Sequence, residues 1–188
     1  HVTNGSSTSN RVIFMACVTH NQVALCDRNC HKSIEQGLML TGAKPVYMVP
    51  SRNRYGIIGP IYPQEMQPET LQKKISESPL TKDKAGQKPS YCVVTNCTYD
   101  GVCYNAKEAQ DLLEKTSDRL HFDEAWYGYA RFNPIYADHY AMRGEPGDHN
   151  GPTVFATHST HKLLNALSQA SYIHVREGRG AINFSRFN

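Results

Sequence analysis

The chain has 188 residues, of which 39% are hydrophobic and 20% are charged, so it is long enough for one domain with a core and is not a disordered chain. Its net charge is only +3 and its lysines form no dense basic run, which argues against a nucleic-acid-binding protein. It contains no apolar stretch of membrane-spanning length and no signal-peptide pattern, so we expect a cytoplasmic protein without a membrane partner.

A small, hydroxyl-rich turn at residues 2–10 leads into an apolar run at residues 12–18. Gly5 permits close backbone approach, and Ser6 and Ser7 offer hydroxyl and N–H groups where a helix would begin. A helix N-terminus with such groups favours a bound phosphate. The alternative is an ordinary helix cap with no ligand.

A short buried strand is predicted at residues 23–26, and His31 follows just beyond its carboxyl end. Ligands bind at this end of the strands in open α/β sheets, although His31 could equally be a helix-start residue with local partners. The next helix is predicted to direct Ile34, Leu38 and Leu40 towards the core.

Further strands and helices alternate along the chain. Strands are predicted at residues 45–50, 91–95 and 120–123, and helices at residues 69–78 and 105–116. Such alternation is typical of a doubly wound α/β fold, with a mostly parallel sheet between two helical layers. We therefore expect a three-layer α/β/α architecture.

Two unusual runs follow the last predicted strands. Asp123 lies at the end of one strand, close to Trp126, which is the only tryptophan. Lys162 follows an apolar segment at residues 154–156 and precedes a helix-like segment at residues 163–167. A lysine in such a setting is a candidate nucleophilic amine. The alternatives are a solvated lysine, a helix-capping aspartate and a core tryptophan.

The six cysteines do not occur in a CxxC spacing, and we expect buried free thiols in a reducing cytosol. Cys26, Cys30 and His31 have a spacing that fits no standard zinc finger, so no metal is expected.

A phosphate cradle, an imidazole, a carboxylate and a lysine, each beside a strand end, are the groups that pyridoxal 5'-phosphate requires. A lysine binds its aldehyde, a carboxylate pairs with its pyridinium nitrogen, and an imidazole can stack on its ring. The four groups occur at Ser6, His31, Asp123 and Lys162. The sequence therefore predicts a pyridoxal-phosphate enzyme.

Four motifs carry a resemblance to a known family. Their positions are residues 3–10, 27–33, 123–126 and 159–162. In this order they resemble the bacterial Orn/Lys/Arg decarboxylases, which have the aspartate-aminotransferase fold (fold type I). Residues 16–21 and 127–132 resemble the biodegradative, acid-inducible arginine decarboxylases within that family.

The resemblance implies cofactor contacts for five residues around the ring. Lys162 would form the Schiff base and Asp123 would pair with the pyridine nitrogen. Ala125 and His31 would pack on opposite ring faces, and Trp126 would lie near the phenolic oxygen.

The resemblance also implies that Ser6, Ser7 and Ser159 hold the phosphate, and that His161 lies near Lys162 and the reacting carbon. The family often has Thr where this chain has Ser6, and the hydroxyl is retained.

The activity implied by the resemblance is decarboxylation of L-arginine to agmatine and CO2, with one proton consumed and acid resistance as its role. Lysine or ornithine decarboxylation is an alternative, as is a non-catalytic structural role for an isolated fragment. Residues 1–188 would be the central part of the cofactor-binding large domain of a longer protein, without its wing and carboxyl-terminal domains. Dimers with shared active sites, assembled into a decamer, are expected. Asp138, His139, Asp148 and His149 form a titratable cluster to which we assign no role.

Overall fold

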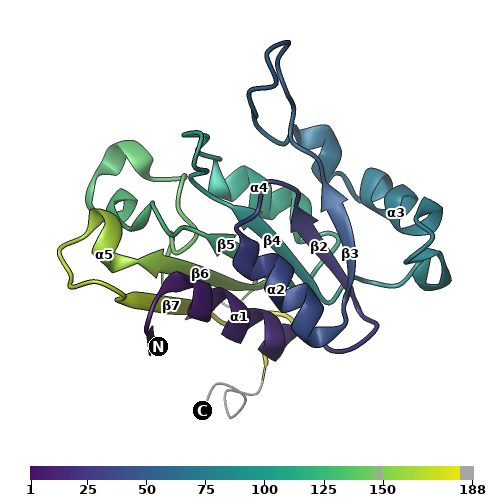
Figure 1. Ribbon diagram of the computed structural model, residues 1–188, viewed down its shortest axis with the longest axis horizontal. Coiled ribbons are helices and arrows are strands. Elements are labelled where there is room, and N and C mark those ends of the chain that lie inside the picture. Colours follow the sequence, from purple (N-terminus) through teal and green to yellow (C-terminus); the bar gives the residue numbers. More distant parts are fainter. Residues whose placement is uncertain (146, 148–149, 183–188) are drawn as a thin grey trace.

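Seven strands of the described chain form one sheet in the order β1-β7-β6-β5-β4-β2-β3 (Figure 1). This computed structural model describes residues 1–145, 147 and 150–182. The strands are β1 (Val2–Thr3), β2 (Val23–Asp27), β3 (Lys44–Met48), β4 (Tyr91–Thr95), β5 (Arg119–Asp123), β6 (Thr153–Ser159) and β7 (Ser171–Arg176). Strands β2 to β6 are mutually parallel, whereas β7 is antiparallel to β6 and β1 is antiparallel to β7. The expected mostly parallel sheet is confirmed.

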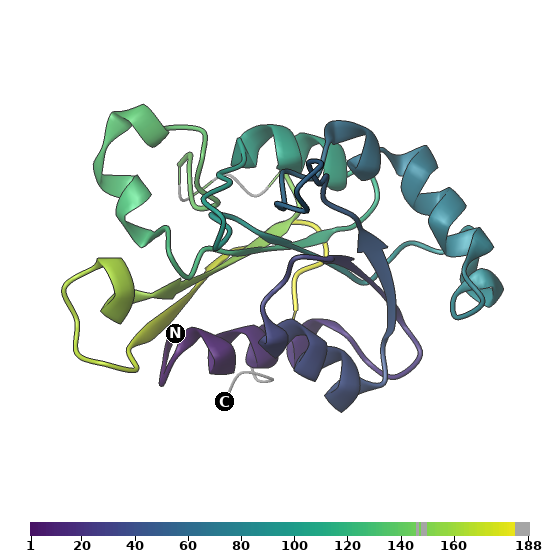
Figure 2. The ribbon, with the colours of Figure 1, turned by 45° about the horizontal axis from the view of Figure 1, so that its top comes forward.

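Helices cover both faces of the sheet, which confirms the three-layer architecture (Figure 2). The helices are α1 (Ser6–Cys17), α2 (Lys32–Thr41), α3 (Pro68–Glu77), α4 (Ala106–Leu113) and α5 (Thr160–Leu163), with 3-10 turns η1 (Pro63–Met66), η2 (Lys82–Lys84), η3 (Gly128–Phe132) and η4 (Pro134–Tyr136). Alternate residues of one strand enter different cores: Leu25 packs in the cluster that includes α3 and α4, and Ala24 packs in the cluster with α1 and α2. A buried parallel strand has this two-sided apolar pattern.

Local sequence explains where the main helices begin and end. Gly5 precedes α1 with φ 114°, and Gly42 ends α2 in the left-handed conformation with φ 67°, where side chains are rarely tolerated. Pro68 occupies the first position of α3, where its missing N–H costs nothing. The Asn105 side chain caps α4 by accepting a hydrogen bond from the Glu108 N–H at 3.1 Å.

The helix expected at residues 163–167 is wrong. Helix α5 ends at Leu163, and Leu164 is already extended. The Thr160 N–H donates to the Ala170 carbonyl, which returns the chain to β7, a strand that the sequence patterns did not indicate. Leu167 is 90% exposed, so it contributes nothing to the core that a helix would require. Leu40, expected in the core, is also exposed, because α2 directs only Ile34 and Leu38 inwards.

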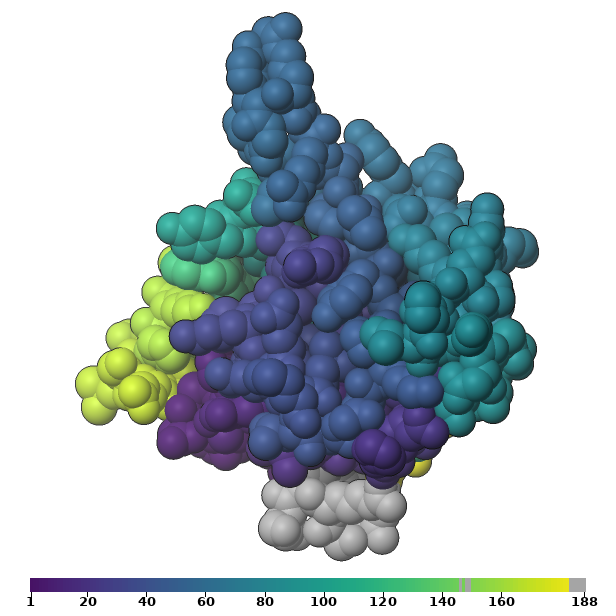
Figure 3. Space-filling model, turned by 45° about the vertical axis from the view of Figure 1, so that its right-hand side comes forward, coloured from purple at the N-terminus to yellow at the C-terminus, as the bar shows by residue number. Residues whose placement is uncertain are grey.

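One segment between β3 and η1 projects from the body of the molecule (Figures 1 and 3). Within this segment, Arg52 and Ile58 pair in a single antiparallel β-bridge. In the part of the chain that the structure describes, no helix has both the length and the apolar character needed to cross a membrane.

Candidate active site

A pocket of about 380 Å³ lies where the parallel strands end. Its lining comes from the segments after β2, β4, β5 and β6 and from the start of α1. The lining residues are Ser6, Asn29, Cys30, His31, Lys32, Thr95, Cys97, Tyr99, Asp123, Ala125, Trp126 and Lys162. Parallel strands bring their carboxyl ends to one edge, and this fold places ligands there. Six of the nine residues singled out in the sequence line this pocket.

Lys162 lies in α5, directly after β6. Its Nζ is 4.6 Å from the centroid of the Trp126 ring, a distance at which a protonated amine interacts with the aromatic face. Partial burial lowers the pKa of Lys162, while the negative charge of Asp123 opposes that shift. A lowered pKa increases the fraction of neutral amine, which is the nucleophilic form.

Asp123 is the last residue of β5 and is only 3% exposed. Its Oδ2 accepts a hydrogen bond from Asn10 Nδ2 at 2.7 Å. Its Oδ1 accepts from the Ala125 N–H and from Thr157 Oγ1, both at 3.2 Å. All three contacts come from donors, so the carboxylate is held as an acceptor on the wall of the pocket. A buried carboxylate in this state favours a cationic ligand group beside it.

The start of α1 forms the wall contributed by the amino-terminal segment. Gly5, the N-cap residue, has no side chain that could accept hydrogen bonds from the N–H groups of the first turn. Ser159 Oγ donates to Ser6 Oγ at 2.6 Å, which brings the end of β6 against this turn. Ser7 does not line the pocket, and its carbonyl accepts from Arg11 Nε at 3.2 Å. The uncapped helix end and the two serine hydroxyls suit an anionic group.

His31 is both the N-cap of α2 and a wall of the pocket. Its Nδ1 accepts from the Ser33 N–H at 3.2 Å and lies 2.8 Å from Ser33 Oγ. The helix-start and ligand-contact interpretations of His31 are therefore compatible, because the capping contacts fix the ring beside the pocket.

Four of the residues singled out in the sequence have other surroundings. His161 Nδ1 is 2.9 Å from the Ala170 carbonyl, and neither His161 nor Ser159 lines the pocket. His139 binds the Tyr104 carbonyl through its ring at 3.1 Å. Asp138 contributes a backbone carbonyl to the Lys107 N–H at 3.2 Å. The remaining members of that titratable cluster, Asp148 and His149, lie outside the described residues.

Sequence patterns missed the contribution of the segment after β4. Thr95, Cys97 and Tyr99 line the pocket, and their position after a buried strand was the signal that could have found them. Burial raises the pKa of Cys97 and of Cys30 to about 12, so neither thiol is an activated nucleophile. All six cysteines are free, and only some of them are buried. Within the described ranges, no three His, Cys, Asp or Glu side chains cluster as a metal site would require.

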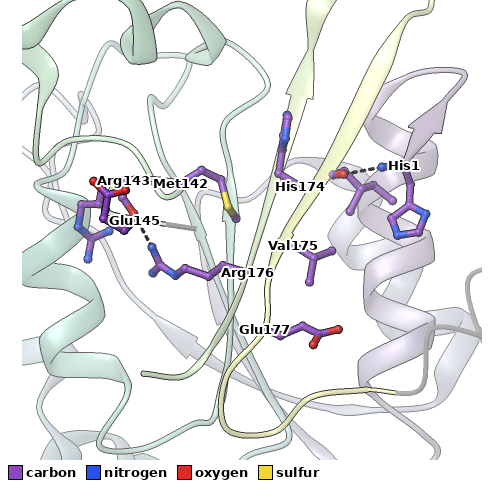
Figure 4. A pocket seen from close by; sticks show the side chains of 10 residues that line it. His1, Met142, Arg143, Glu145, His174, Val175, Arg176 and Glu177 are labelled. Atoms are coloured by element: carbon purple, nitrogen blue, oxygen red, sulfur yellow. Dashed lines mark hydrogen bonds between the residues drawn. The ribbon is translucent and has the colours of Figure 1, made fainter. Parts of the chain in front are cut away.

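A larger cavity of about 610 Å³ lies beside β7 (Figure 4). Arg143 and Arg176 approach each other there, since both donate to Gln110 Oε1, at 2.9 and 2.8 Å. Arg176 also donates to the Arg143 carbonyl at 2.6 Å. The described residues that line this cavity include no lysine. It therefore has carboxylates, at Glu145 and Glu177, without the lysine amine of the smaller pocket.

Comparisons with known proteins agree with this geometry. The family model described as "Orn/Lys/Arg decarboxylase, major domain" matches residues 1–188. The biodegradative arginine decarboxylase of Escherichia coli (strain K12) is 94% identical over 184 residues, which are 98% of this chain and 24% of that protein. The solved lysine decarboxylase A from Pseudomonas aeruginosa has a TM-score of 0.87 and 47% identity, and the match covers 100% of this chain and 25% of that one.

A more distant match shows only the fold. A solved PLP-bound putative aminotransferase from Clostridium difficile 630 has a TM-score of 0.62 at 10% identity, over 99% of this chain and 43% of that one. The chain spans about a quarter of the length of the curated relatives it matches.

Proposed function

The chain belongs to the Orn/Lys/Arg decarboxylase family, and we propose that it is the central part of the large domain of an enzyme that converts L-arginine to agmatine and CO2. The observation that carries the arginine assignment is the 94% identity to the biodegradative arginine decarboxylase. The lysine decarboxylases matched here are more distant, at 47% identity or less.

The residues of the smaller pocket fit pyridoxal 5'-phosphate as the cofactor. An amine with a lowered pKa, at Lys162, suits an aldehyde. A buried carboxylate held only by donors, at Asp123, suits a protonated pyridine nitrogen. The uncapped start of α1, with the Ser6 and Ser159 hydroxyls, suits a phosphate. The donor set therefore matches each end of the cofactor.

Each residue of the pocket would have a separate task. Lys162 would hold the cofactor covalently and then carry a proton at Nζ. Asp123 would stabilise positive charge on the ring nitrogen. The α1 dipole and Ser6 would offset the phosphate charge. His31 and Ala125 would confine the ring between them, and Trp126 would cover Lys162 and exclude water from it.

The bound cofactor would supply an electron sink for the pair left when CO2 departs. The carbon that loses the carboxylate must then receive a proton, and Lys162 Nζ is the proposed donor. His161 remains a proposed second donor, and it would have to leave its present contact with Ala170 to serve. The overall reaction consumes one proton per turnover. Such consumption in the cytoplasm is the proposed basis of acid resistance.

We further propose that the full-length protein has a wing and a carboxyl-terminal domain. It would assemble as a homodimer with shared active sites, and five such dimers would form a decamer. Residues outside this chain would complete the substrate-binding site, because Asp123 is the one carboxylate among the described residues that line the smaller pocket. A guanidinium or ammonium side chain requires acidic partners.

Two measurements on the full-length protein test the proposal. Reduction with borohydride in the presence of pyridoxal 5'-phosphate should add the cofactor mass to the peptide that contains Lys162. Absence of that adduct would overturn the cofactor assignment. Release of CO2 from arginine, lysine and ornithine should then be at least about tenfold faster for arginine, expressed as kcat/KM. A preference for lysine or ornithine would retain the enzyme class and refute the arginine assignment. The isolated chain, titrated with the cofactor in parallel, tests whether this segment alone forms a competent pocket.

A further inference from the structure

Asn10 makes an unusual set of contacts inside the protein. It is 1% exposed and lies one helical turn after Ser6 in α1. Its Nδ2 donates to Asp123 Oδ2 at 2.7 Å and to Ser33 Oγ at 2.9 Å. Its Oδ1 accepts from Thr157 Oγ1 at 2.8 Å. Both amide protons and the carbonyl oxygen are therefore used, so the orientation of the amide is determined.

These contacts connect three separate walls of the pocket. Asp123 ends β5, and Ser33 Oγ also lies 2.8 Å from His31 Nδ1, which fixes the imidazole. The backbone of Asn10 belongs to the helix whose first turn contains Ser6. A movement of Asn10 would thus displace the carboxylate, the imidazole and the helix start together.

Thr157 supports Asn10 from the neighbouring strand. It lies opposite Asp123 in the parallel register of β5 and β6, and it is fully buried. Its hydroxyl has one proton, which Asn10 Oδ1 at 2.8 Å and the more distant Asp123 Oδ1 at 3.2 Å share. The third polar neighbour, His121 Nε2 at 3.3 Å, must then be the donor towards Thr157.

This assignment defines the tautomer of His121. Complete burial lowers the pKa of His121 to about 4, so the ring is neutral near pH 7 and carries a single N–H. With that proton on Nε2, Nδ1 accepts from the Tyr91 hydroxyl. The resulting chain of donors runs from Tyr91 through His121 and Thr157 to Asn10 and Asp123. The reverse orientation would leave Asn10 Oδ1 without its donor.

We propose that Asn10 and Thr157 are positioning residues that hold Asp123, His31 and the start of α1 in one fixed arrangement for the bound cofactor. The inference rests on the proposed function, because it needs a ligand that contacts all three walls. A purely structural network is the competing account. It would affect stability without any specific effect on cofactor binding.

The test uses the full-length protein and two matched substitutions in β6. Thr157→Val removes the hydroxyl that contacts Asn10 and keeps the branched shape. Thr153→Val removes an equally buried hydroxyl from the same strand, which contacts the Gly178 and Arg179 carbonyls and accepts from the Gly178 N–H. Both should lower the thermal midpoint. Only Thr157→Val should raise the Kd for pyridoxal 5'-phosphate, by about tenfold, the low end for residues that orient a ligand-binding group.

Two further readouts separate positioning from general loss of structure. The absorption band of the bound cofactor should shift in Thr157→Val and remain unchanged in Thr153→Val. Thr157→Ser, which restores the hydroxyl, should return the Kd to within about threefold of the unmodified protein. Asn10→Ser, whose side chain is too short to reach Asp123, Ser33 and Thr157 together, is an independent variant and should raise the Kd at least as far.

The outcomes are distinct. If Thr157→Val and Asn10→Ser fold and retain the unmodified Kd and absorption band, the positioning inference is overturned while the proposed function stands. If Thr153→Val weakens cofactor binding as much as Thr157→Val, the effect reflects general destabilisation and the inference is also overturned. Failure of the unmodified protein to bind the cofactor would instead remove the proposed function itself.

Discussion

The pocket at the strand ends and the cavity beside β7 differ in chemistry more than in size. The cavity is the larger, at about 610 Å³ against about 380 Å³. Of its prominent charged groups, Arg176 donates to Gln110 and to the Arg143 carbonyl, and Arg143 donates to Gln110. The pocket instead presents Lys162, whose pKa is lowered, opposite a carboxylate fixed by three donors. A lysine with a lowered pKa in the same pocket as a buried acid is better support for a site of chemistry than volume is.

Replacing Lys162 removes the amine on which the chemistry proposed for the smaller pocket depends. Lys162→Ala should lower kcat by about 10^4-fold or more, because the covalent attachment and the proposed proton donor are lost together. Steady-state decarboxylation by the full-length protein measures the effect, and Lys162→Arg serves as the charge-retaining control. Activity within about tenfold of the unmodified protein would exclude a covalent role for Lys162.

A matched removal of negative charge compares the two cavities directly. Asp123→Asn in the pocket should reduce kcat by about 10^2-fold, since it removes the negative charge that we propose to face the ring nitrogen. Glu145→Gln in the larger cavity should change kcat by less than about twofold. Equal losses in both variants would contradict the assignment of the chemistry to the smaller pocket.

Glu124, which directly follows β5, is connected to the larger cavity through two histidines, and this connection can be weakened. Glu124 is fully buried, accepts from Asn96 Nδ2 at 2.8 Å and the Ala141 N–H at 2.7 Å, and pairs with His158 at 3.0 Å. The His158 ring lies 4.7 Å from that of His174, which lines the larger cavity.

Glu124→Gln should weaken the charged contacts by about 2 kcal/mol. Hydrogen exchange at the Ala141 amide would then accelerate by roughly 30-fold, and mass spectrometry of that segment measures it. The control, Glu114→Gln, alters an exposed pair with Arg179 at 3.9 Å and should change exchange little. Unchanged exchange in Glu124→Gln would show that the segment is held by other contacts.

The smallest expected effect is a pH dependence that involves His121. In the unfolded chain this imidazole takes up a proton near pH 6.5, whereas in the folded protein burial lowers its pKa to about 4. The stability contributed by the neutral ring is therefore complete above about pH 6.5 and is lost as the pH falls towards 4. At pH 5.5 the loss should be about 1 kcal/mol. His121→Gln should flatten the dependence of the unfolding midpoint on pH in this window, and an unaltered slope would assign it to other groups.

The sequence predicted the strand ends better than the connections between them. Asp123 and Lys162 were recognisable because each follows a buried apolar strand, and parallel register alone brings such residues together. The strand β7 was missed because its alternating Tyr172, His174 and Arg176 include polar and charged side chains at an edge of the parallel core. The helix assigned to residues 163–167 failed because leucines favour helices only where a core accepts them.

The Asn10 network could not be read from the sequence for a different reason. Asn10 and Asp123 are separated by 113 positions and Asn10 and Thr157 by 147, and no local pattern marks residues that meet only after folding. Polar residues inside strands and helices are usually interpreted as surface or cap residues. Their burial becomes apparent only when both neighbouring elements are in place.

The wide separation of these contacts has a consequence for when the proposed cofactor could bind. The Ser6 and Ser159 hydroxyls meet across 153 positions, so the site does not exist until β6 has joined the sheet beside α1. During synthesis, a ribosome must release nearly this entire segment before the cofactor can bind. Contacts of such high sequence separation form slowly. If the proposed cofactor binds there, its concentration should stabilise the whole sheet, since a ligand bound only by the folded state shifts the folding equilibrium.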